Sequence, residues 1–95
     1  MSLSDPKSGA YWSATNELLS GLEHSISKYG SWENLTPRQM VAIIKAEISE
    51  CDLAIEMGHI VGEEGLLYEA AQAGSCFIKL IATIRNQQAR RGDVK

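Results

Sequence analysis

Three segments of this chain carry apolar residues at the spacing of an α-helix, over residues 11–29, 37–57 and 65–88. Wound at about 100° per residue, each segment gathers apolar side chains on one face and leaves charged side chains on another. No stretch between turn signals alternates apolar and polar residues for long enough to form a half-buried β-strand. The pattern therefore predicts an all-α fold built from three main helices.

Local signals mark the ends of these helices. Gly30 follows the first segment and suits the left-handed residue that commonly ends a helix. Thr36 can cap the second helix, and Pro37 takes its first position, where a missing N–H costs nothing. The short connection around Gly62 and Gly65 predicts that the second and third helices form an antiparallel hairpin, with the first helix packed across them.

The length of 95 residues is near the lower end of the range for one domain. We expect a single helical domain over residues 1–95, with flexible tails at 1–9 and 89–95. A domain this small buries a modest share of its surface and has a thin margin of stability. We therefore expect it to complete its core by homo-oligomerisation.

Composition argues against several classes of protein. The net charge of −3 provides no attraction for nucleic acid or an anionic membrane. No apolar run is long enough to span a bilayer, and the polar start lacks the apolar centre of a signal peptide, so we expect a cytoplasmic protein. Cys51 and Cys76 lie within helical patterns and are expected to be apolar core residues rather than a disulfide framework.

The second helical segment places an acidic residue where an apolar one is expected. Its apolar stripe consists of Met40, Ile43, Ile44, Ile48, Cys51, Ala54 and Ile55. Glu47 falls near the middle of this stripe, and Glu50 falls at its edge. An ionised carboxylate on a buried face is costly unless a partner or a metal compensates it. Glu47 is therefore the residue that points most strongly to a functional site.

A third carboxylate, Glu69, lies at the edge of the apolar stripe of the third helix. In an antiparallel hairpin it would converge with Glu47 and Glu50. Three carboxylates in one cleft repel each other unless they share a divalent cation, and hard oxygen ligands suit Mg²⁺ or Mn²⁺. Magnesium held in this way completes its shell with substrate phosphates. The residues thus predict metal-assisted attack of water on a phosphoryl group.

Other interpretations of these residues stay open. Glu47 would be satisfied equally by an ion pair with Lys79 or Arg85, or by Ser or Tyr hydroxyl groups at a polar helix interface. Glu50 and Glu69, nearer the stripe edges, would then be solvated. The small residues between Ala70 and Ser75 predict close packing of another helix against the third.

The spacing of these residues resembles the MazG-like all-α nucleotide pyrophosphohydrolases. Glu47-x-x-Glu50 is similar to the Glu-Glu-x-x-Glu motif of that superfamily. Glu69-x-x-Gln72, after a short turn, is similar to its Glu-x-x-Asp motif.

Two further runs resemble small phage and prophage members of that superfamily. LYEAAQAG at 67–74 looks most like their second motif, and KYG at 28–30 is similar to their Lys-Trp-Gly. The likeness covers residues 24–88.

The resemblance implies hydrolysis of a nucleoside triphosphate to its monophosphate and pyrophosphate. Glu47, Glu50 and Glu69 would hold Mg²⁺ or Mn²⁺, with Glu47 and Glu50 at the catalytic centre. The protein would be a dimer or tetramer that builds its base pocket partly across subunits. The substrate-binding residues implied are Tyr29 and Trp32 for the base, Lys28 and Lys79 for the phosphates, and Gln72.

Two positions depart from the family pattern. Ala46 stands where the first Glu is expected, and Gln72 stands where Asp is usual. Loss of two carboxylates weakens metal affinity, so the expected activity ranges from weak hydrolysis to none. The competing class is a non-catalytic helical oligomer that acts as a phage-derived interaction or regulatory protein. A helical DNA-associated regulator is disfavoured because no helix carries a basic stripe.

Overall fold

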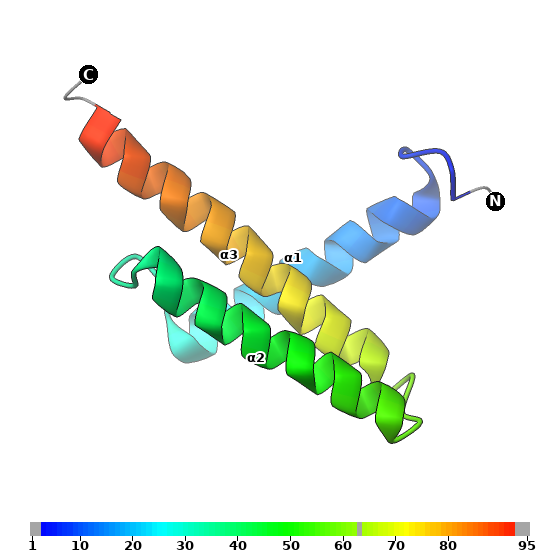
Figure 1. The fold of residues 1–95 in the computed structure, drawn as a ribbon. Helices are drawn as coiled ribbons and strands as arrows, with labels where there is room; N and C mark the ends of the chain where they lie inside the picture. Colours follow the sequence, from blue (N-terminus) through cyan, green and yellow to red (C-terminus); the bar gives the residue numbers. More distant parts are fainter. Residues whose placement is uncertain (1–2, 63, 93–95) are drawn as a thin grey trace.

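The computed structural model describes residues 3–62 and 64–92, with side chains through Arg90. It consists of α1 (Gly9–Tyr29), α2 (Pro37–Glu56) and α3 (Leu66–Gly92), and the described residues form no strand. The expectation of an all-α fold with three helices is confirmed. Figure 1 shows α2 and α3 side by side and running in opposite directions, with α1 crossing α3. The α1 backbone packs on α3 alone, and not across both helices as expected.

A capping box begins α2. The Thr36 hydroxyl accepts a hydrogen bond from the Gln39 backbone N–H at 3.1 Å, and the Gln39 side-chain oxygen accepts one from the Thr36 N–H at 2.9 Å. Such a cap contributes about 1 kcal/mol. Pro37 follows as the first helical residue, and Gly30 ends α1 with a φ of 81°. Both signals act where the sequence predicts.

The helix bounds differ from the predicted ones by a few residues. α1 begins at Gly9 rather than at residue 11, and α3 continues to Gly92 rather than ending at residue 88. The segment 89–92, expected to be part of a flexible tail, is therefore helical; Ala89 and Arg90 are good helix formers. The other ends of the expected tails, residues 1–2 and 93–95, lie outside the described residues.

The buried core lies between α2, α3 and the connection that precedes α2. It consists of Trp32, Met40, Ile44 and Cys76, with Leu35, Leu80 and Ile84 packed against them. Gln87 donates a hydrogen bond to the Leu35 carbonyl at 3.2 Å and so ties the connection to α3. Both cysteines are free, Cys76 buried and Cys51 half-buried, as expected of core residues.

Small residues bring α1 close to α3. A Cβ atom added at Gly74 would overlap the Leu18 side chain, and one added at Gly21 would lie 2.7 Å from Ser75 Oγ. The buried Ser75 hydroxyl lies 3.0 Å from the Leu18 carbonyl of α1 and 2.9 Å from the Ala71 carbonyl of its own helix. The predicted close packing against the small residues of α3 is confirmed.

Apolar side chains remain exposed along one side of α2 and α3. Val41, Ile48 and Ile55 recur every seven residues on α2, and Phe77 and Ile81 lie one turn apart on α3, each with 39–56% of its surface exposed. Ile48 is rotated by about 80° from the core residue Met40, and Phe77 by about 100° from the core residue Cys76, in the same sense. In an antiparallel pair this rotation places both stripes on the same side. We call these five residues the apolar stripe. Within the described residues, no helix is both long and apolar enough to cross a membrane.

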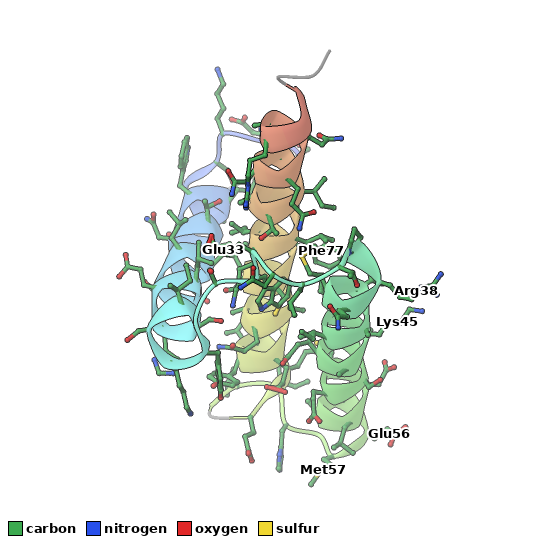
Figure 2. The ribbon with its side chains drawn as sticks, turned by 90° about the vertical axis from the view of Figure 1, so that its left-hand side faces the viewer. Glu33, Arg38, Lys45, Glu56, Met57 and Phe77 are labelled. Carbon is green, nitrogen blue, oxygen red and sulfur yellow. The ribbon has the colours of Figure 1, made fainter. Side chains whose placement is uncertain are left out.

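Charged residues of α2 lie on its outer side. Figure 2 shows Arg38, Lys45 and Glu56 pointing away from α3. All three are exposed. This agrees with the helical periodicity, which separates charged side chains from the apolar face.

Candidate functional site

A cavity of about 550 Å³ lies along α3, with α1 and α2 contributing its two sides. α3 lines it with Tyr68, Gln72, Cys76 and Lys79. The remaining lining residues are Ser25 and Tyr29 of α1, Ser31, Trp32 and Leu35 of the connection, and Ile43 and Glu47 of α2. This volume is within the range of small-molecule binding sites, which is about 300–1,000 Å³.

The cavity gathers a majority of the residues singled out from the sequence. Those that line it are Tyr29, Trp32, Glu47, Gln72 and Lys79. Glu50, Glu69 and Lys28 do not line it. Lys28 is exposed, and its Nζ lies 5.3 Å from the centre of the neighbouring Tyr29 ring.

Lys79 is a buried cation at the cavity wall, with 5% of its surface exposed. Its Nζ donates hydrogen bonds to Ser25 Oγ at 2.9 Å and to the Gly30 carbonyl at 3.3 Å, and lies 4.7 Å from the centre of the Trp32 ring. Burial lowers the pKa of Lys79. No carboxylate among the described residues pairs with it. Its positive charge is therefore not neutralised by an acidic side chain of the described residues.

Glu47 faces the same cavity from α2 and is half-buried. Burial raises the pKa of its carboxyl group, and the nearby charge of Glu50 raises it further. Within the described residues Glu47 forms no ion pair with Lys79 or Arg85, the two partners considered from the sequence. The carboxylate thus has no ion-pair partner among the described residues.

Glu69 lies buried beside these carboxylates, with 8% of its surface exposed. Burial raises the pKa of Glu69, and the charges of Glu47, Glu50 and Glu64 raise it further. Glu47 and Glu50 on α2 thus lie close enough to Glu69 on α3 for their charges to act on it, and we call these three residues the acidic cluster. Among the described residues, however, no three acidic, His or Cys side chains are already arranged to hold a metal ion.

Cys76 lines the cavity as a protonated thiol. Burial raises its pKa, and the charge of Glu47 raises it further, against a smaller opposite effect of Lys79. The thiolate is the nucleophilic form of cysteine, so these surroundings make Cys76 unreactive. It acts as part of the apolar wall.

The aromatic side chains of the cavity differ in how much of each ring a ligand can reach. Trp32 is 7% exposed, belongs to the core and has the Lys79 ammonium over its ring. Tyr29 and Tyr68 are 71% and 43% exposed. Tyr68 was not predicted from the sequence as a site residue. It precedes Gln72 by four residues and Lys79 by eleven, and these spacings place all three side chains on one face of α3.

A second hollow adjoins the cavity. This open groove of about 640 Å³ is lined by Ser13, Asn16, Glu17, Ser20, Gly21 and His24 of α1, together with Tyr68, Ala71 and Gln72 of α3. Tyr68 and Gln72 line both hollows. They therefore form the junction between the cavity and the α1 groove.

Comparison of the chain with models of protein families, with curated proteins and with solved structures found no match.

Proposed function

We propose that the protein is a Mg²⁺-dependent nucleoside triphosphate pyrophosphohydrolase of low activity. The observation that supports this most is the cavity itself. It has a carboxylate without an ion-pair partner, Glu47, on α2 and a buried ammonium without an acidic partner, Lys79, on α3. A ligand that carries both phosphates and a divalent cation matches this pair of charges.

The acidic cluster has the chemistry of a magnesium site. Glu47, Glu50 and Glu69 supply hard oxygen ligands and have no cationic partner in the described residues. Glu50 is exposed and Glu47 half-buried, so rotation of their side chains would let them converge with Glu69. Mg²⁺ or Mn²⁺ bound there would neutralise the carboxylates and polarise a phosphoryl group.

The residues of the chain have separable roles in the proposed reaction. Lys79 donates N–H groups to the oxygens of the phosphate chain and holds it in the cavity. Glu47, which faces the cavity from α2, accepts a proton from the attacking water. The water oxygen bonds to the α-phosphorus, and the bond to the bridging oxygen of the β-phosphate breaks. The products are a nucleoside monophosphate and pyrophosphate.

The proposed functional unit is a cytoplasmic homo-oligomer, a dimer or tetramer, built on α2 and α3 as an antiparallel pair. The apolar stripe supports this, because five large side chains on one side of two adjacent helices are exposed in the single chain. Its seven-residue spacing on α2 is typical of a seam between packed helices. Association of two copies through the stripe would bury these side chains.

The second candidate is a non-catalytic helical oligomer that acts through protein interactions. Ala46 and Gln72 favour it, because each replaces a carboxylate of the motif that the chain resembles. The apolar stripe fits this candidate as well as it fits the enzyme. Turnover therefore distinguishes the two candidates, and oligomeric state does not.

The test of the proposed reaction is the identity of its products. The purified chain is incubated with common and modified nucleoside triphosphates, with Mg²⁺ or Mn²⁺ and with a chelator. We expect monophosphate and pyrophosphate in equal amounts, formed only with the metal. Formation of diphosphate and phosphate, or no turnover of any nucleotide by the folded protein, would contradict the proposal.

A further inference from the structure

We infer that the base of the bound nucleotide stacks on Tyr68 and contacts Gln72, at the junction of the cavity and the α1 groove, and not on Trp32. The nature of the ligand rests on the proposed function. The orientation of the ligand and the identity of the stacking residue rest on the contacts of this site.

Lys79 fixes the anionic end of the ligand. It is the one buried cation among the described residues, and its N–H groups otherwise meet only neutral oxygens and the Trp32 ring. The carbonyl of Gly30, at the C-terminal end of α1, adds the negative end of a helix dipole and helps to keep the ammonium charged. The phosphates therefore lie at this end of the cavity.

The same contacts prevent a nucleotide base from stacking on the Trp32 ring. The ammonium of Lys79 lies over its ring, and the side chain is almost fully buried in the core. A base would have to displace the cation that holds the phosphates. Trp32 thus orients Lys79 through a cation–π contact and supports the anion site.

Tyr68 lies at the other end of the same stripe of α3. Residues 68, 72 and 79 differ in rotation by only about 40°, and the axial rise from Tyr68 to Lys79 is about 16 Å. Tyr68 and Lys79 both line the cavity, and this axial rise separates them along it. An elongated ligand with phosphates at Lys79 therefore places its ring beside Tyr68.

The surroundings of Tyr68 suit a heterocyclic ring. Its own ring is partly exposed and borders both hollows. The Gln72 amide, one turn further along α3, offers both a donor and an acceptor to a base edge. Across the junction, Asn16 and His24 of the α1 groove add further polar groups. Tyr68 and Gln72 are therefore the residues that would determine which base is accepted.

Binding of α,β-methylene nucleoside triphosphates, in which the scissile bond cannot be hydrolysed, tests this orientation with Mg²⁺ present. Trp32 fluorescence reports occupation of the Lys79 end, in a Trp12→Phe background that removes the other tryptophan. Inorganic pyrophosphate serves as the probe without a ring. We expect Tyr68→Ala to weaken nucleotide binding by about 5- to 100-fold and to leave pyrophosphate binding within about twofold. Tyr68→Phe should bind both probes as the wild type does.

Tyr29→Ala and Tyr11→Ala are the matched controls. Tyr29 lines the cavity from α1, and Tyr11 is a tyrosine of α1 outside it, with 42% of its surface exposed. The inference is overturned if Tyr29→Ala weakens nucleotide binding and Tyr68→Ala does not, if both probes weaken equally in Tyr68→Ala, or if the folded protein binds no nucleotide. If nucleotide binding depends on Tyr68 but the natural triphosphates are not hydrolysed, the inference about the base is supported. The proposed hydrolysis is then contradicted.

Discussion

The ammonium group of Lys79 lies 4.7 Å from the centre of the Trp32 ring. This contact joins α3 to the connection between α1 and α2, and the same ammonium reaches Ser25 on α1. A single side chain thus links the parts of the molecule that surround the cavity. Loss of the Trp32 ring would remove both core packing and the support of Lys79.

Trp32→Ala should lower the free energy of unfolding by about 3–5 kcal/mol, the usual cost of removing a buried large aromatic side chain. The chain contains a matched control, because Trp12 is 63% exposed on α1. Trp12→Ala should change stability by no more than about 0.5 kcal/mol. Urea denaturation followed by circular dichroism measures both, and similar losses in the two variants would contradict the placement of Trp32.

Because α1 and α3 approach closely where they cross, we expect a Gly→Ala substitution at this point of α1 to destabilise the protein. Gly21→Ala should gain about 1 kcal/mol in helix propensity, yet its new Cβ would lie 2.7 Å from Ser75 Oγ. We expect the clash to outweigh the gain and the variant to be less stable than the wild type.

The double-mutant cycle with Ser75→Ala isolates this clash. Without the hydroxyl oxygen, the nearest Ser75 atom to the new Cβ is 3.8 Å away, an ordinary contact. Gly21→Ala should then be neutral or stabilising in the Ser75→Ala background. An equal loss in both backgrounds, measured by urea denaturation, would show that the two helices do not cross here.

The acidic cluster predicts that mild acid stabilises the metal-free protein. Burial and neighbouring charges raise the pKa of Glu47 and Glu69 above the ordinary value of 4.5, so the folded state holds protons that the unfolded chain has lost. Stability should increase as the pH falls from 7 toward 5. The pKa values of Cys51 and Cys76 are raised from 9.0, so the thiols stay protonated throughout this window.

Glu69→Gln should reduce this pH dependence, whereas Glu56→Gln, on the outer side of α2, should leave it unchanged. The measurement is the urea midpoint of each variant at pH 5 and pH 7 in a chelating buffer. A wild-type midpoint that falls on acidification would contradict a dominant effect of the raised pKa values of Glu47 and Glu69.

We expect the protein to form an oligomer through the apolar stripe, and we expect one lysine introduced into the stripe to disrupt this oligomer. Ile48→Lys or Phe77→Lys should reduce the mass in solution, because a buried ammonium without a partner is costly at an apolar interface. Leu53→Lys is the control, since Leu53 is similarly exposed but lies on a different side of α2. Light scattering after size-exclusion chromatography compares the three. A monomeric wild type, or an unchanged mass in Ile48→Lys and Phe77→Lys, would contradict this use of the stripe.

Local signals in the sequence predicted the helices well. Thr36 and Pro37 define the start of α2 through a cap within four residues, and Gly30 ends α1 through its own backbone conformation. Such signals do not depend on distant parts of the chain. Periodicity likewise placed Glu47 on the same face of α2 as the buried Met40 and Ile44, because rotation about one helix axis decides that property. It did not foresee that Ile43, Ile48 and Ile55 of the predicted apolar stripe are exposed in the single chain.

The arrangement of the helices and the contacts of the site needed the structure. Periodicity tells which face of a helix is apolar, but it does not tell which helix covers that face, so the packing of α1 on α3 alone was not foreseen. Lys79 and Trp32 are 47 positions apart, and their stacking depends on the path of the connection. Tyr68 was missed for the same reason, because its importance arises from the two hollows that meet at its ring.

The most direct test of the proposed function is metal-dependent pyrophosphate release by the wild type, Glu47→Gln and Glu56→Gln. Both substitutions replace a carboxylate of α2 with an amide of the same size, at the cavity in one case and on the outer side of the helix in the other. We predict that the wild type and Glu56→Gln release pyrophosphate at similar rates and that Glu47→Gln is slower by about 100-fold or more, as expected for loss of a general base. Equal rates in all three, or no metal-dependent release by the folded wild type from any nucleotide, would contradict the account.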